Sequence, residues 1–231
     1  MHPDPGRRGH HHAHMFQDHR WAVGGAVLMY VAAAVIFTIM AAAPTSFDGV
    51  DAWWHDAMVN IETGVLSGMA HALDFIGGTI VTAPLRIGVG LYLAAKRRWA
   101  ALTTLLVATG LTEVAIGGFK ALYDRARPLD SLVETSGASF PSGHATAAAV
   151  TAVVLVIILI SPGEHRRAWE VRAGVVAFVM ALSRTYLRAH WLSDVVAGAL
   201  LGAATALAVA AVVHVVRGRE LGAPVEAVAD G

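Results

Sequence analysis

A histidine and an aspartate four residues apart stand at the junction between two long apolar runs, where they could form a nucleophilic pair. His190 and Asp194 follow Arg184 in the stretch SRTYLRAHWLSD. If a helix starts here, residues four apart share one face, so the Asp194 carboxylate can accept a hydrogen bond from one imidazole nitrogen of His190. That bond fixes the tautomer and leaves the other nitrogen free to attack an electrophile. Taken alone, the pair also fits an ordinary surface hydrogen bond.

A second group of residues has the types needed to hold a phosphate. Lys120 and Arg127 lie in the stretch KALYDRARP, and Ser142 and Gly143 lie in PSGH, directly before an apolar run. Ammonium and guanidinium groups bind the non-bridging oxygens of a phosphate, and a guanidinium does so with two parallel hydrogen bonds. Ser142 suits the N-cap of the following helix, whose free N–H groups can bind an anion. Gly143 lets the backbone approach closely.

The three stretches occur in the order Lys-x6-Arg-Pro, Pro-Ser-Gly-His and Ser-Arg-x5-His-x3-Asp. This order resembles the signature of the phosphatidic acid phosphatase type 2 superfamily, which also contains bacterial acid phosphatases and vanadium haloperoxidases, and the resemblance covers about residues 113–215. It implies that His190 forms a phosphohistidine, that Asp194 orients it, and that His144 is the general acid. It also implies a phosphate cradle made of Lys120, Arg127, Ser142, Gly143 and Arg184. The resemblance requires no metal and no cofactor.

The composition predicts an all-α, polytopic membrane protein. Of 231 residues, 56% are hydrophobic and 15% are charged, whereas soluble domains have roughly 25% charged residues. Lys plus Arg and Asp plus Glu are balanced at 17 each, and no basic stripe suggests a nucleic-acid partner. Cysteine is absent, which excludes disulfides and thiol chemistry. The expected partners are the bilayer and a phosphorylated lipid, and the oligomeric state stays open.

Apolar runs near the ~20 residues that cross a bilayer predict six transmembrane helices in one domain, 21–216. The predicted spans are 21–43, 79–95, 99–119, 143–161, 170–187 and 191–216. Residues 45–78 carry paired tryptophans among acidic residues, which favours one interfacial helix that ends at the Gly77-Gly78 pair. The His-rich segment 1–20 and segment 217–231 are expected to be loose tails.

Six spans place both tails on one face, and basic residues indicate which face that is. Residues assigned to the face of the tails include most of the basic side chains: Arg7, Arg8, Arg20, Lys96, Arg97, Arg98, Arg166, Arg167, Arg172, Arg217 and Arg219. The positive-inside rule therefore predicts cytoplasmic termini in the cell membrane. The same topology places all three signature stretches together at the outer face.

Other residues carry weaker expectations. Arg125 and Arg188 flank the cradle, and each is a solvated loop charge, a headgroup contact or a contact for the second phosphate of a diphosphate. Arg86 and Glu113 lie roughly 10 Å deep in adjacent spans, where intramembrane charges pair, so we expect an ion pair in the bundle interior beneath the cradle. The alternative is that each faces a wet groove separately.

The resemblance implies a membrane lipid-phosphate phosphatase, and undecaprenyl diphosphate is the expected substrate. Phosphatidylglycerophosphate, phosphatidic acid and diacylglycerol pyrophosphate are alternatives, because the signature reads the phosphate and not the lipid tail. A vanadate-dependent haloperoxidase shares the cradle, but the apolar spans argue against it. A transporter or pseudo-enzyme on the same scaffold would lack a catalytic residue, and the sequence lacks none.

Overall fold

Long apolar runs without internal proline produce most of the helices of this chain. The computed structural model describes residues 6–161, 163 and 165–221, and the side chains of residues 23–161, 163 and 165–216. Within these residues the elements are α1 (Gly6–Ala42), a 3-10 helix η1 (Pro44–Phe47), α2 (Asp48–Asn60), α3 (Gly64–Gly77), α4 (Thr79–Ala95), α5 (Trp99–Tyr123), α6 (Gly143–Leu159), α7 (Arg166–Tyr186) and α8 (Leu192–Leu221). The described chain is entirely helical apart from its connections.

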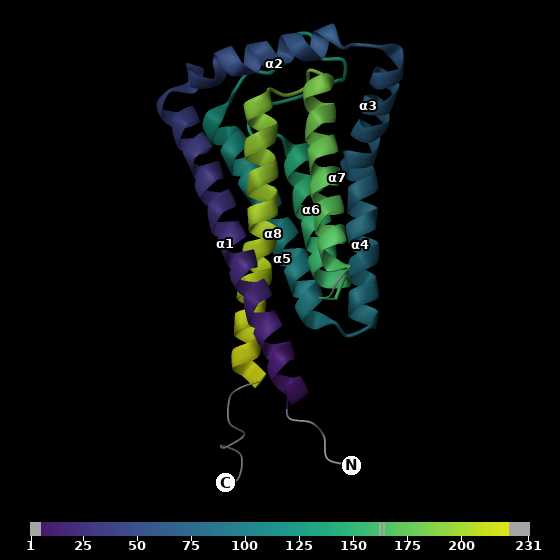
Figure 1. Cartoon of the computed structure of the whole chain (residues 1–231). Helices are drawn as coiled ribbons and strands as arrows, with labels where there is room; N and C mark the ends of the chain where they lie inside the picture. Colours follow the sequence, from purple (N-terminus) through teal and green to yellow (C-terminus); the bar gives the residue numbers. More distant parts are fainter. Residues whose placement is uncertain (1–5, 162, 164, 222–231) are drawn as a thin grey trace.

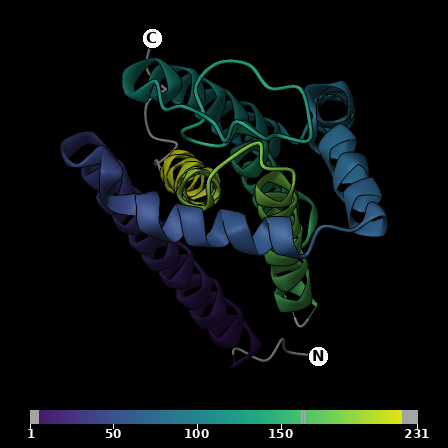
Figure 2. The ribbon, with the colours of Figure 1, turned by 90° about the horizontal axis from the view of Figure 1, so that it is seen from above.

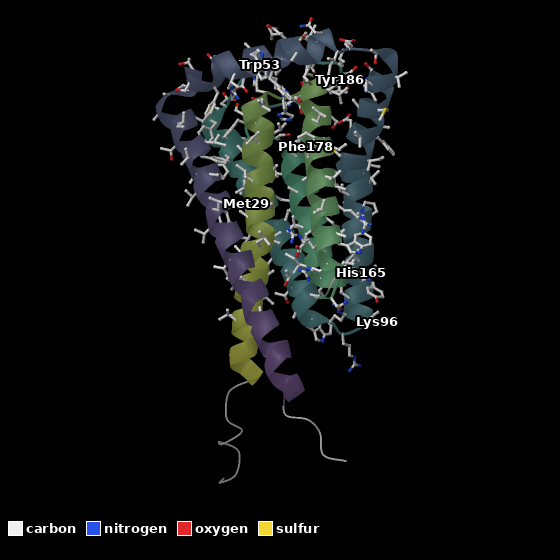
Figure 3. The ribbon with its side chains drawn as sticks, in the orientation of Figure 1. Met29, Trp53, Lys96, His165, Phe178 and Tyr186 are labelled. Carbon is white, nitrogen blue, oxygen red and sulfur yellow. The ribbon has the colours of Figure 1, made fainter. Side chains whose placement is uncertain are left out.

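The helices form a bundle with one helix laid across its end. Helices α1 and α4 to α8 run along the bundle, and α2 crosses the end at which α7 stops and α8 begins (Figure 1). Viewed onto that end, α2 passes over α8 towards α7, and the long connection between α5 and α6 lies at the same end (Figure 2). Trp53 marks this end and Lys96 marks the opposite one (Figure 3). The α5–α6 connection, the α7–α8 connection and α2 thus converge at one end.

Each predicted span corresponds to a helix, but six spans are not confirmed. Three helices are long and apolar enough to cross a bilayer, over Val23–Ala42, Trp99–Tyr123 and Leu192–Val216, and a fourth span results if α3 and α4 count together. Helix α6 is apolar but has only 17 residues. Helix α7 opens with the charged sequence RRAWEVR, which lowers its hydropathy. If α3 and α4 count as one span, the two predicted spans that are not confirmed are α6 and α7, although both helices lie where the sequence predicts them.

The region predicted as one interfacial helix, 45–78, is two helices with different directions, so this prediction is wrong in part. Helix α2 alone lies across the bundle end, and α3 packs against α7 before the chain bends by 44° into α4. Thr63 separates the two helices, because its hydroxyl accepts a hydrogen bond from Leu66 N at 3.3 Å and caps α3. The expected stop at Gly77-Gly78 is confirmed, since α3 ends there.

The predicted tails are shorter than expected. Helix α1 already begins at Gly6, and α8 continues to Leu221. No proline interrupts either stretch, so helical hydrogen bonding continues beyond the apolar segment. Residues 1–5 and 222–231 of the predicted tails lie outside the described residues.

Close approach of α6 and α8 brings two signature stretches together. A Cβ on Gly198 would lie 2.6 Å from Thr146 Oγ1 and 2.8 Å from Ser142 O, and a Cβ on Gly202 would overlap the α6 backbone. Only glycine fits here, so the Gly-x-x-x-Gly spacing of Gly198 and Gly202 serves close packing of α8 against α6. As a result, Ser142 N reaches Asp194 O at 3.0 Å.

Candidate active site

All eight signature residues lie at one end of the bundle, beneath α2. Each comes from a helix end or the connection beside it: Lys120 from the last turn of α5, Arg127 from the loop after it, Ser142, Gly143 and His144 from the start of α6, Arg184 from the last turn of α7, His190 from the α7–α8 connection, and Asp194 from the first turn of α8. Because these residues lie at helix ends or in connections, their side chains reach the site without interrupting the hydrogen bonds within the helices.

The predicted His190–Asp194 pair is present and fully buried. His190 Nδ1 lies 3.5 Å from Asp194 Oδ2, which is longer than an ordinary N–H···O hydrogen bond. Asp194 Oδ2 also accepts a hydrogen bond from Trp191 N at 2.9 Å, so the carboxylate is fixed beside the ring. On the other side, His190 Nε2 lies 3.1 Å from Arg127 Nη1. Since arginine only donates, Nε2 is the acceptor and the proton belongs on Nδ1, facing Asp194.

The protonation state of His190 follows from its surroundings. The pKa of His190 is lowered to about 4: burial is the largest cause, the nearby Arg127 and Arg184 also lower it, and Asp194 acts in the opposite direction. Desolvation outweighs the carboxylate, because water can no longer stabilise the imidazolium ion. At neutral pH the ring is therefore uncharged, which is the form that can act as a nucleophile.

Two of the cradle cations are held by backbone carbonyl groups of the loop before α6 and of the α7–α8 connection. Lys120 Nζ donates to Ala138 O. The Arg127 guanidinium donates to Gly137 O at 2.9 Å, to Ala138 O at 3.1 Å and to Ala189 O at 2.7 Å. These uncharged partners orient the two cations without neutralising them. Their positive charge stays available to an anion in the site.

The first turn of α6 is built as the sequence predicts. Ser142 is the N-cap residue of this helix, and its hydroxyl accepts from Ala145 N at 3.5 Å. Gly143 and His144 follow as the first helical residues. A helix N-terminus of this kind presents free N–H groups that can bind an anion.

Arg184 and His144 share a carboxylate that the sequence analysis does not predict. Asp74 Oδ1, in the last turn of α3, accepts a hydrogen bond from Arg184 Nη1 and lies 3.3 Å from His144 Nε2. The Arg184 side chain is buried, and its Nε has no hydrogen-bond partner among the described residues. Asp74 thus joins a cradle cation to the expected general acid.

The structure corrects the expectation for Arg125. Its Nη1 donates to Asp194 Oδ1 at 2.6 Å and to Ser193 Oγ at 2.7 Å, and its Nη2 donates to Asp51 Oδ2 at 2.7 Å. Burial by itself lowers the pKa of Arg125, but Asp194 and Asp51 together raise it. Two carboxylates neutralise this guanidinium, so Arg125 supports Asp194 and does not extend the phosphate cradle.

Arg188 is also occupied. Its Nη1 lies 3.1 Å from Glu62 Oε2, and its Nε lies 3.3 Å from Asp130 Oδ2. Asp130 accepts a further hydrogen bond from His55 Nε2 at 2.9 Å. This chain of ion pairs connects α2, the α2–α3 turn, the α5–α6 connection and the α7–α8 connection. The second-phosphate role expected of Arg188 has no support in this geometry.

The predicted Arg86–Glu113 ion pair is confirmed, but its position is not the one expected. Arg86 Nη1 lies 3.0 Å from Glu113 Oε1, and the guanidinium also donates to Thr151 Oγ1 at 2.9 Å and Ala147 O at 3.2 Å. The Arg86 side chain is 15% exposed, whereas Glu113 is 58% exposed. The pair therefore fastens α4 and α5 to α6 from the bundle surface.

The sequence analysis missed Asp51 and Asp74 as members of the site. Both were visible only as acidic residues that interrupt an apolar pattern. An acid in such a segment needs a partner, which is the signal that could have identified them. Their partners lie far along the chain, with Ser193 142 residues from Asp51 and Arg184 110 residues from Asp74.

Comparison with known proteins agrees with the geometry. The family model described as PAP2 superfamily matches residues 101–217, and the chain belongs to this superfamily of phosphatidic acid phosphatase type 2 proteins. Phosphatidylglycerophosphatase B of Bacillus subtilis (strain 168) is 32% identical over 145 residues, which cover 60% of this chain and 68% of that protein.

Two solved structures share the fold. The crystal structure of a transmembrane PAP2-type phosphatidylglycerolphosphate phosphatase from Bacillus subtilis has a TM-score of 0.68 at 26% identity and covers 87% of this chain and 98% of its own. The crystal structure of Aquifex aeolicus LpxE has a TM-score of 0.56 at 24% identity, with 67% and 91% covered. These matches confirm a membrane-protein fold of the PAP2 type, which the signature predicts.

Removing Asp51 should destabilise the bundle end. Asp51 is buried and accepts from Arg125 Nη2, from Ser193 N at 2.9 Å and from Ser193 Oγ at 2.7 Å. Asp51→Ala leaves these donors buried without a partner, and we expect a loss of about 3–5 kcal/mol in the free energy of unfolding. Thermal unfolding in detergent measures it. Asp56→Ala is the matched control, because that side chain is 78% exposed on the same helix. Equal unfolding temperatures for the two variants would contradict the assignment.

The low pKa of His190 predicts a pH dependence of stability. The pKa is about 4 in the folded chain, against 6.5 for an unperturbed histidine, so the unfolded chain takes up this proton first as the pH falls. The contribution of neutral His190 to the free energy of unfolding is complete above about pH 6.5. It is lost as the pH falls from about 6.5 to about 4, and the total loss is about 3 kcal/mol. His190→Asn should show a shallower loss than the wild type in denaturant unfolding over this range. Parallel pH curves for the two proteins would rule out a buried neutral His190.

Proposed function

We propose that this chain is an integral membrane phosphatase that hydrolyses the phosphate monoester of a glycerophospholipid, with phosphatidylglycerophosphate as the substrate to test first. The observation that carries the proposal is the convergence of His190, His144 and three cations, Lys120, Arg127 and Arg184, at one end of a membrane bundle. Membership of the PAP2 superfamily and the likeness to phosphatidylglycerophosphatase B support it.

The first chemical step uses the neutral His190. Its Nε2 attacks phosphorus, the N–P bond forms, and the P–O bond to the glycerol oxygen breaks with the electron pair on that oxygen. His144 protonates the leaving oxygen, so no alkoxide is released. Arg127 Nη1, 3.1 Å from His190 Nε2, lies where it can stabilise the phosphoryl oxygens during the attack.

The second step returns the enzyme to its starting state. The neutral His144 accepts a proton from water, and the water oxygen forms a bond to phosphorus. The N–P bond then breaks, and inorganic phosphate leaves. Asp194 stabilises the positive charge that develops on His190 while phosphorus is bound to Nε2, because its carboxylate lies 3.5 Å from Nδ1.

The charges around the cradle favour a monoester over undecaprenyl diphosphate, the substrate expected from the sequence. A second phosphate group needs further cations, and the two nearest candidates are occupied by carboxylates: Arg125 by Asp51 and Asp194, and Arg188 by Glu62 and Asp130. Asp130 and Glu62 add negative charge beside the site. A distal phosphate would therefore be repelled by these carboxylates, and neither Arg125 nor Arg188 would be free to bind it.

Turnover measurements on purified protein test the proposed function. We expect phosphate release from phosphatidylglycerophosphate in mixed micelles, with kcat/KM at least about tenfold higher than for undecaprenyl diphosphate. The reason is that Arg125 and Arg188 are already paired with carboxylates, so the diphosphate lacks about one favourable charge contact, and a tenfold change corresponds to about 1.4 kcal/mol. His190→Ala should abolish turnover while the chain still folds, as a cooperative thermal unfolding transition in detergent would show. Acid-labile phosphate trapped on His190 from labelled substrate identifies the nucleophile. Higher kcat/KM for the diphosphate would overturn the monoester assignment, and a phosphoenzyme on another residue would overturn the mechanism.

We further propose that the site faces the outside of the cell. Lys96, Arg97 and Arg98 follow α4 at the opposite end of the bundle from the site, and this basic cluster favours the cytoplasm (Figure 3). The native chain contains no cysteine, so single cysteines report their own location. We expect an impermeant maleimide to label Thr135→Cys in intact cells and to label Lys96→Cys only after lysis. The reverse pattern would place the site in the cytoplasm.

A further inference from the structure

One carboxylate that no signature motif contains connects the expected acid to the cradle. Asp74 lies in the last turn of α3, whereas His144 begins α6 and Arg184 ends α7. Asp74 Oδ1 accepts from Arg184 Nη1 and lies 3.3 Å from His144 Nε2. A single oxygen atom therefore fixes two groups that the proposed reaction uses.

The end of α3 is shaped to receive the His144 ring. A Cβ added to Gly77 would lie 3.1 Å from His144 Cδ2 and 2.7 Å from Met180 Sδ, and one added to Gly78 would lie 4.0 Å from His144 Nε2. Gly77 is itself buried. A larger side chain would push the ring away from α3 and from Asp74. The glycine pair thus permits the close approach on which the Asp74–His144 contact depends.

Electrostatics explains why a carboxylate is useful at this position. His144 faces Arg184 from α7 and Arg127 from the loop before α6, and both cations oppose a positive charge on the imidazole. Asp74 is the negative group that acts on the same ring. An adjacent carboxylate favours the imidazolium form, which His144 needs in order to donate a proton to the leaving oxygen.

The geometry points to Asp74 as the positioning residue of the general acid: it holds His144 by Nε2, so that Nδ1 is the nitrogen that protonates the leaving oxygen and later takes the proton of water. Asp74 also holds Arg184 by Nη1, which leaves the buried, unpartnered Nε of Arg184 for a phosphate oxygen. This inference rests on the proposed phosphatase activity. It adds a second His–Asp pair, on the leaving-group side, to the His190–Asp194 pair on the attacking side.

The test separates proton donation from simple structural support by varying the leaving group. An alkyl leaving oxygen, as in phosphatidylglycerophosphate, needs protonation, whereas the p-nitrophenolate of p-nitrophenyl phosphate leaves without it. We compare kcat/KM, which reports the steps up to the phosphoenzyme, because kcat also contains the water step that is common to both substrates. For Asp74→Asn we expect kcat/KM on the lipid to fall about 100-fold and kcat/KM on p-nitrophenyl phosphate to fall less than about tenfold. Asp74→Glu should restore part of the lipid activity. Asp48→Asn, which makes the same charge change on an exposed residue of α2, should match the wild type.

Protection by inorganic phosphate against thermal unfolding supplies a readout that does not depend on turnover. We expect Asp74→Asn to keep this protection, since the cradle cations remain. Wild-type kcat/KM on the lipid in Asp74→Asn would overturn the inference, as would equal losses of kcat/KM on both substrates or loss of phosphate protection. If Asp74 only competed with phosphate for Arg184, the Asn variant would bind phosphate more tightly and keep its kcat, which also overturns it. A wild type inactive on both substrates would refute the proposed function instead.

Discussion

A buried carboxylate, Asp194, determines much of the architecture at the functional end of this molecule. A charge in that position is stable only when other groups compensate it. Arg125 supplies the opposite charge at 2.6 Å, and Trp191 N supplies a hydrogen bond at 2.9 Å. Arg125 then needs its own second partner, Asp51, which ties α2 to the start of α8. Asp194 is thus connected through Arg125 to Asp51, and these contacts hold α2 across the end of the bundle.

The same residue constrains the packing of α8 against α6. Because Ser142 N donates to Asp194 O, the start of α6 and the start of α8 are held together, and Gly198 and Gly202 leave the space that this contact requires. The first turn of α6, which carries His144, and the first turn of α8, which follows His190, are therefore joined directly, although the two histidines lie on different elements.

The sequence predicts the helices and the signature residues well, because both depend on local information. Apolar runs define α1 and α4 to α8, and the motifs place Lys120, Arg127, His144, Arg184 and His190 at helix ends that meet. The roles of Arg125 and Arg188 could not be predicted, since each depends on carboxylates that the fold brings from distant segments. The division of residues 45–78 into α2 and α3 also escaped prediction, because one capping hydroxyl, Thr63, decides it against a continuous amphipathic pattern.

The length of α6 has a consequence for how a lipid could reach the site. Its 17 residues extend about 26 Å, which is shorter than the ~30 Å hydrocarbon thickness of a typical bilayer. Such hydrophobic mismatch is accommodated by local thinning of the bilayer around the shorter helix. A helix end that meets a thinned leaflet is close to the lipid phosphates, and His144 lies in the first turn of α6. On the proposed function, a phospholipid would then bring its phosphate to this residue by lateral diffusion within the leaflet, with its acyl chains still in the hydrocarbon.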